Sequence, residues 1–220
     1  MFSSIGDVLQ PVLQLLVRED WKTLRSTVLT DPTLFRNIAS AVSACSEFNG
    51  MTLLHATVRY NPPSDIIAQM IHLCPHMTAA TDCLDRTPLH VAAGSGANPE
   101  VIAMIAHAHP PACDIQDRDG KTPLHFACDG SCSLFEDDGD VNSSKQPLNH
   151  ESVHALLSYS VQAAFPQDDR DLLPLQYALL SHASSKTVIL IGDAMMEFFS
   201  SQQIFKDRPC KRARKMSVVS

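Results

Sequence analysis

Ten histidines and seven cysteines are the residues of this 220-residue chain that could hold a metal ion or act as nucleophiles. His125, Cys128 and Cys132 lie close enough together in the sequence to begin a zinc site. A structural zinc site needs four ligands, and no second ligand pair follows at a zinc-site spacing. We therefore expect no bound zinc.

An acidic run, 136–140, is the candidate for calcium binding. If the calcium-loop template begins at Asp138, Ser143 stands where the template needs glycine, and Asn149 stands where it needs glutamate. The chain also lacks the glycine-rich phosphate loop, the dinucleotide-binding motif and the nucleophile elbow. The sequence predicts no cofactor and no enzymatic activity.

Three of the histidines recur at a fixed spacing. His55, His90 and His125 each end a Thr-x-Leu-His tetrapeptide, and successive copies are 35 residues apart. A fourth copy, Leu173-Pro-Leu-Gln176, begins 51 residues after the third. Such a period indicates stacked units that bury their apolar faces on one another. Equivalent histidines in successive units form a structural ladder and do not converge on one catalytic centre.

Each tetrapeptide has the features of a helix start. Threonine can cap the first turn, and proline fits the first helical position because no backbone donor is needed there. Two residues before each copy stands a residue that can adopt positive φ in a tight turn. These residues are Gly50, Asp85, Gly120 and Asp171. An acid stands five residues before each copy, at Glu47, Asp82, Asp117 and Asp168.

A second helix is expected in each unit, and in the first two units it ends before Pro75 or Pro110. Turn, helix, loop and helix, with Thr-Pro-Leu-His-x-Ala opening the first helix, resembles the ankyrin repeat. The Glu-Asp-Trp segment 19–21, the stretch 59–63 and the proline-terminated helices are similar to an algal-type subgroup of that family. The resemblance implies an all-α solenoid of about four helix-turn-helix units.

We divide the chain on this basis. The expected parts are a helical N-terminal cap (1–46), a repeat stack (47–200) and a basic, disordered tail (201–220). The repeats are 47–81, 82–116, 117–167 with an inserted loop at about 130–150, and a degenerate 168–200. Insertions in repeat arrays lie on one face, which is often the binding face, and a solvated loop without a task is the alternative.

The resemblance implies a non-catalytic protein-interaction scaffold or adaptor. Such stacks bind partners on a concave face formed by the turn tips and the first helices. Carried to this sequence, the expected contact residues are Phe48, Asn49, Met51, Arg59, Tyr60, Leu84, Arg86, Ser95, Arg118, Lys121, Asp129 and Arg170. The arginines predict a locally basic groove, and so a protein partner that presents an acidic or phosphorylated segment.

Charge is distributed unevenly along the chain. From Lys206 onward the tail holds six of the 17 basic residues and one of the 24 acids. The remaining body therefore carries a net charge of −12, and direct nucleic-acid binding by the repeats is not expected. No stretch approaches the ~20 apolar residues that span a bilayer.

The tail contains Lys211, Arg212, Arg214 and Lys215, a pattern typical of nuclear import signals, and Ser217 is a candidate phosphorylation site. A nuclear regulatory protein imported through this tail is the alternative function. A solvated tail and a lipid anchor at Cys210 are the other interpretations. The cysteines Cys45, Cys74, Cys113 and Cys128 are read as reduced core residues of an intracellular protein, cytoplasmic or nuclear.

The predicted last helix is unusually apolar. In the predicted helix 188–199, Asp193 and Glu197 form one narrow polar sector, which Ser200 continues just past the C-terminal end. Apolar residues cover most of the remaining surface of this helix. A terminal repeat normally shows water a polar face. Either 201–205 folds back over this helix, or the helix is a docking or dimer surface.

Overall fold

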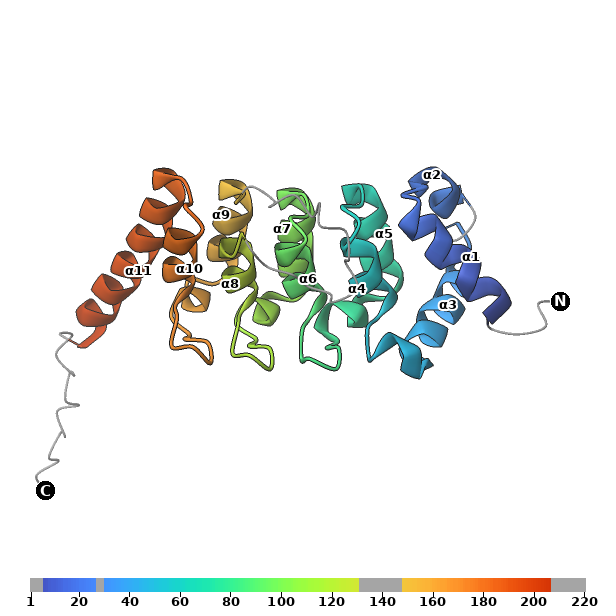
Figure 1. Ribbon diagram of the computed structural model, residues 1–220, viewed down its shortest axis with the longest axis horizontal. Helices are drawn as coiled ribbons and strands as arrows, with labels where there is room; N and C mark the ends of the chain where they lie inside the picture. Colours follow the sequence, from blue (N-terminus) through green and yellow to red (C-terminus); the bar gives the residue numbers. More distant parts are fainter. Residues whose placement is uncertain (1–5, 27–29, 131–147, 207–220) are drawn as a thin grey trace, which may run out of the picture.

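The computed structural model describes residues 6–26, 30–130 and 148–206, and every regular element in these segments is helical (Figure 1). The all-α class predicted from the sequence is therefore confirmed. Three N-terminal helices come first: α1 (Gly6–Val17), α2 (Trp21–Leu24) and α3 (Pro32–Ala44).

Four helix pairs follow. They are α4 (Leu53–Val58) with α5 (Ser64–Leu73), α6 (Pro88–Gly94) with α7 (Pro99–Ala108), α8 (Pro123–Cys128) with α9 (His150–Tyr159), and α10 (Pro174–Leu180) with α11 (Ser185–Lys206). Short 3-10 turns lie at Ser46–Phe48, Pro75–Ala79, Pro110–Cys113 and Gln162–Ala164.

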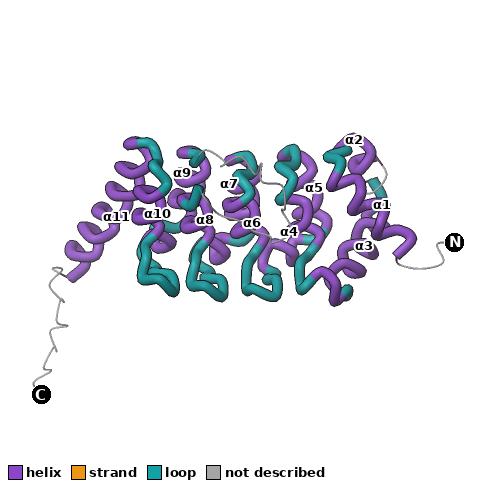
Figure 2. The backbone as a smooth tube through the Cα atoms, viewed as in Figure 1, coloured by secondary structure: helices purple, strands orange, loops and turns teal. Residues whose placement is uncertain are grey.

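The pairs stack into two rows along the long axis of the molecule (Figure 1). The inner row is α4, α6, α8 and α10, and the outer row is α5, α7, α9 and α11. Figure 2 shows that long connecting loops gather along one edge of the stack. We call the loops at 46–51, 82–86, 117–121 and 168–172 the fingers.

Local sequence explains where the helices begin. Proline occupies an early position of α6, α7, α8 and α10, where its missing N–H costs nothing. Asn98 and Asn149 cap α7 and α9 by accepting from the backbone N–H two residues on, at 2.9 Å in both cases.

The core is a continuous band between the rows. Leu54, Leu89 and Leu124 are fully buried at equivalent places in three inner helices. Each such leucine contributes about 2 kcal/mol of burial free energy. At the N-terminal end, α3 contacts α4 and α5 and buries Phe35 and Val42, so it covers the first repeat.

Helix α11 departs from its neighbours because it has 22 residues, against ten in α5, α7 and α9. It reaches Lys206, beyond the predicted tail boundary at 201, and 201–205 continues the helix instead of folding back over it. No proline lies between Ser185 and Lys206 to end the helix, as Pro75 and Pro110 do after α5 and α7.

Candidate partner-binding surface

Three fingers are tight turns organised by a buried aspartate. Oδ1 of Asp82, Asp117 and Asp168 accepts from the backbone N–H groups two and four residues later, at 2.8–3.0 Å. Each aspartate thereby closes its own loop through hydrogen bonds from the loop backbone to its side chain. The predicted positive φ is found at Gly50, Asp85, Gly120 and Asp171. Gly120 is also sterically required, because a Cβ there would lie 3.0 Å from Asp168 Cα.

Backbone hydrogen bonds join each finger to the next. The N–H of Cys83 donates to the Asn49 carbonyl at 2.7 Å, and that of Arg118 donates to the Leu84 carbonyl at 3.0 Å. The N–H of Asp169 donates to the Asp119 carbonyl at 2.9 Å. These three bonds fix the spacing of the tips, so their exposed side chains form an ordered row.

The histidines hold the inner helices to the fingers. In His55, Nδ1 accepts from the Thr52 backbone N–H at 3.0 Å, so the proton is on Nε2, which donates to the Arg86 carbonyl at 3.0 Å. His90 and His125 repeat this arrangement with the carbonyls of Lys121 and Leu172. Each ring therefore links its own repeat to the finger of the next.

All three rings are buried, and burial favours their neutral form. Burial lowers the pKa of His55 and of His90 to about 4, and it also lowers the pKa of His125. Because both ring nitrogens are occupied by hydrogen bonds, these histidines act as structural supports of the surface.

The predicted contact residues fall into three groups by exposure. Asn49, Leu84, Arg118 and Arg170 are exposed on the fingers. Phe48, Met51, Arg59, Tyr60, Ser95, Lys121 and Asp129 are half-buried. Arg86 is buried. The structure therefore exposes four of them on the finger row and gives several of the others internal contacts.

Arg86 does not present its charge at the surface. Its guanidinium lies 2.8 Å from Asp82 Oδ2, and only 9% of the arginine side chain is exposed. The acid that organises the finger also draws this arginine inward, which the sequence pattern did not reveal. Arg86 is thus a support of the second finger.

Lys121 is also held in place by neighbours. Its Nζ lies 3.2 Å from Asp129 Oδ2, 4.7 Å from the centroid of the Tyr177 ring and 5.6 Å from that of Phe126. An ammonium over two aromatic faces is stabilised by their quadrupoles. Tyr177 in turn donates to Asp168 Oδ2 at 2.5 Å. Sequence analysis missed Phe126 and Tyr177; the signal was an aromatic residue directly after the tetrapeptide.

Ser95 and Tyr60 have roles within the stack as well. Ser95 Oγ lies 2.8 Å from the Val91 carbonyl oxygen of its own helix and 3.1 Å from the Val58 carbonyl oxygen of the preceding repeat, so its hydroxyl is shared between the two. The half-buried ring of Tyr60 packs against the core, with the Arg59 guanidinium 5.8 Å from its centroid. Ser95 thus connects the second repeat to the first, and parts of the Arg59, Tyr60 and Ser95 side chains stay accessible.

Comparison with known proteins agrees with this architecture. A family model described as ankyrin repeats (3 copies) matches residues 53–145. This is an ankyrin-repeat protein. The ankyrin solenoid predicted from the sequence is thereby confirmed, whereas the algal-type subgroup stays a prediction. No curated protein matches the chain.

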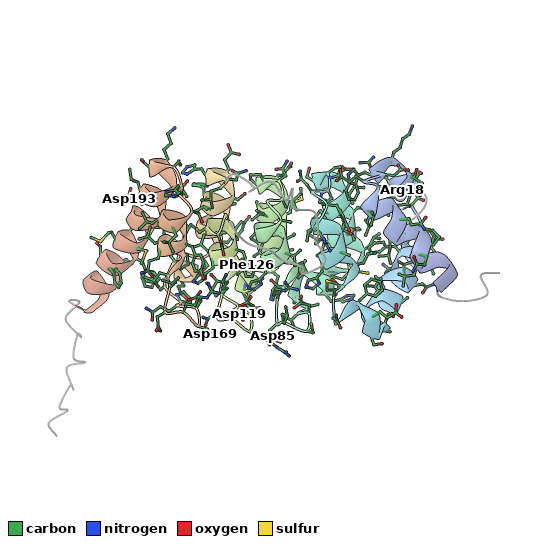
Figure 3. All side chains as sticks on the ribbon, in the orientation of Figure 1. Arg18, Asp85, Asp119, Phe126, Asp169 and Asp193 are labelled. Carbon is green, nitrogen blue, oxygen red and sulfur yellow. The ribbon has the colours of Figure 1, made fainter. Side chains whose placement is uncertain are left out.

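The exposed charges of the ankyrin fingers correct one expectation. Exposed acids on the four fingers are Glu47, Asp85, Asp119, Asp169 and Asp171, against the exposed bases Arg118 and Arg170. Figure 3 shows Asp85, Asp119 and Asp169 along the finger edge. Arg118 itself lies 3.3 Å from Asp85. The exposed positions of the fingers are therefore net acidic, contrary to the basic character expected there, because Arg86 and Lys121 are engaged internally.

In the segments described above, no group of three or more His, Cys, Asp or Glu residues could hold a metal ion. His125 has both ring nitrogens occupied, and burial raises the pKa of the Cys128 thiol to about 12. Both residues thus belong to the ankyrin core. Cys132 and the acidic run 136–140 lie outside the described residues.

Free cysteines are buried at Cys74, Cys113 and Cys128, half-buried at Cys45 and exposed at Cys83. Among the helices that the structure describes, none combines the length and apolar character needed to cross a membrane. The tail residues Lys211, Arg212, Arg214, Lys215 and Ser217 lie outside the described residues.

Proposed function

We propose that this ankyrin-repeat protein is a non-catalytic scaffold that binds a protein partner along its finger row and the adjoining ends of its inner helices. The observation that carries the proposal is the set of three finger-to-finger backbone hydrogen bonds. They order exposed side chains before a partner arrives, which lowers the entropy lost on binding.

The proposed partner segment is basic. Five exposed carboxylates against two guanidinium groups on the fingers favour a segment that carries lysine or arginine. Leu84, with 42% of its surface exposed, offers an apolar contact in the same row. The acidic or phosphorylated segment predicted from the sequence is not favoured by this distribution.

Capture from a native lysate with the full chain as bait tests this function. We expect the double variant Asp119→Lys, Asp169→Lys to lose the specific proteins that the unchanged chain retains. Glu100→Lys is the matched control, since Glu100 is an exposed acid at the start of α7, at the end of the repeat away from the fingers. If the unchanged chain, the double variant and Glu100→Lys capture the same proteins in equal amounts, the proposed surface is contradicted.

The alternative function, a nuclear regulator, rests on the basic tail. Six of the 17 basic residues lie from Lys206 onward. Imaging of the full chain beside a variant with alanine at Lys211, Arg212, Arg214 and Lys215 addresses it. Nuclear accumulation that depends on these four residues would support this alternative, and an unchanged distribution would remove it.

A further inference from the structure

Helix α11 exposes an apolar stripe that runs along one side. Ile189 is 59% exposed, Met196 67% and Phe199 54%, and Gly192 lies between the first two. We call Ile189, Gly192, Met196 and Phe199 the α11 seam. Their spacings of three, four and three residues place them on one side of a helix, as in helix–helix interfaces. Lys186, Asp193, Glu197 and Ser200 form the polar stripe beside it.

The seam lies beside the face that other outer helices bury. Ile67 of α5, Ile102 of α7 and Val153 of α9 are fully buried, and α5, α7 and α9 each contact the next outer helix. Val188 is the corresponding residue of α11 and is only half-buried. In the part of the chain that the structure describes, no helix follows α11 to cover this face (Figure 1).

Other contacts leave the seam accessible. Thr187 and Ile191 are fully buried, so the opposite side of α11 faces the stack. Phe165 anchors the C-terminal half, with its ring centroid 4.9 Å from that of Phe198. A Cβ added at Gly192 would meet nothing within 4 Å, so the middle of the seam is open.

We propose that the α11 seam pairs with the α11 seam of a second copy of this chain, with the two helices antiparallel. The spacing is symmetric about residue 194, so a two-fold axis there sets Ile189 opposite Phe199 and Gly192 opposite Met196. Each flexible, large methionine then fills the space above a residue without a side chain. Self-complementarity of this kind is what a two-fold interface requires.

The size of the seam sets the strength of the dimer. Its exposed side chains and their half-buried neighbours offer roughly 400 Å² of apolar surface per copy, which is large for a monomer. A pair would bury on the order of 800 Å² in total, below the ~1,200 Å² of standard stable interfaces. We therefore expect a weak, concentration-dependent monomer–dimer equilibrium and not an obligate dimer.

Sedimentation velocity of the full chain, over a concentration series through the micromolar range, measures this equilibrium. We expect concentration-dependent dimerisation of the unchanged chain. Met196→Lys should raise the dimer dissociation constant at least ~10-fold, because the new lysine would bury an unpaired charge in the interface. Glu197→Lys is the control: it places lysine at an exposed position of the polar stripe of the same helix, away from the seam, and should leave dimerisation unchanged. Circular dichroism of each variant establishes that the fold is kept.

Gly192→Leu separates the proposed register from unspecific association. The monomer accommodates the new side chain, and leucine favours the helix more than glycine does. In the proposed dimer this leucine occupies the space of the opposing Met196, so dimerisation should weaken at least ~10-fold. Tighter dimerisation of this variant, a monomeric unchanged chain, or no effect of Met196→Lys would each overturn the proposal.

Discussion

Two arginines in neighbouring fingers show how burial decides what an ion pair contributes. Arg86 lies 2.8 Å from Asp82, with side-chain exposures of 9% and 1%. Arg118 lies 3.3 Å from Asp85, with exposures of 61% and 57%. Water screens the second pair but not the first. Loss of the first arginine also leaves a buried carboxylate without its partner.

We therefore expect Arg86→Met to lower the free energy of unfolding by about 3 kcal/mol. Arg118→Met, the same exchange in an exposed pair, should lower it by no more than ~0.5 kcal/mol. Urea unfolding followed by circular dichroism measures both. Similar losses in the two variants would show that burial does not govern these pairs.

Ser152 is a second residue with an unusual environment. It is 4% exposed, and its Oγ has no hydrogen-bond partner among the described residues. The equivalent residues of α5 and α7 are the fully buried Ile66 and Val101. Ser152→Val should raise the free energy of unfolding by about 1 kcal/mol, because it removes an unpaired buried hydroxyl.

Chemical unfolding of Ser152→Val beside Ser158→Val checks this prediction. Ser158 is exposed on the same helix and donates to the His154 carbonyl at 2.7 Å, so its replacement should not stabilise the protein. Equal effects of the two changes would mean that valine acts through the helix backbone and not through the buried site.

At the scale of the secondary-structure elements, the histidine ladder makes stability depend on pH. The pKa of His55 and of His90 is about 4 in the folded chain and about 6.5 when unfolded. Below pH 6.5 the unfolded chain binds protons that the folded chain excludes until pH 4. The free energy of unfolding should therefore fall by about 2 kcal/mol per histidine between pH 7 and pH 5.

Unfolding measured at pH 7 and pH 5 tests this dependence. His90→Gln should reduce the difference between the two values by about 2 kcal/mol, since glutamine does not titrate. Glutamine is the natural occupant of this place in the fourth repeat, where Gln176 Oε1 accepts from the Leu173 N–H at 2.7 Å. An unchanged difference would assign the pH dependence to other groups.

The helix starts, the positive-φ turn residues and the ladder could be predicted because each depends on a few neighbouring residues that recur with the repeat. The internal contacts of Arg86 and Lys121 could not be predicted, because they depend on the direction in which a long side chain leaves its turn. The length of α11 could not be predicted either. Its C-terminal half has no counterpart in the other repeats, and Phe165, from a preceding turn, helps to hold it.

At the scale of the whole molecule, burial is concentrated in the middle of the stack. The central helices α6 and α8 are buried along nearly their whole length, whereas Val17 of α1 is 63% exposed and α11 exposes its seam. In a solenoid each unit is stabilised only by its neighbours, so the ends open more readily than the centre.

Native-state hydrogen exchange should accordingly show the slowest amides in α6 to α9, with much faster exchange in α1 and in the C-terminal half of α11. The measurement is exchange followed by peptide mass spectrometry at a protein concentration where the chain is monomeric. Uniform protection along the stack would mean that the chain unfolds as one cooperative unit.

The ladder also has a direction. Each histidine reaches forward along the chain to a carbonyl of the following finger, and Gln176 uses its Oε1 to cap its own helix. New units can thus be grafted before the first repeat without altering the tetrapeptides. Addition of a unit after the fourth requires threonine at 173 and histidine at 176, which would restore the tetrapeptide and its forward hydrogen bond. Within the residues that the structure describes, the forward ladder therefore ends at Gln176.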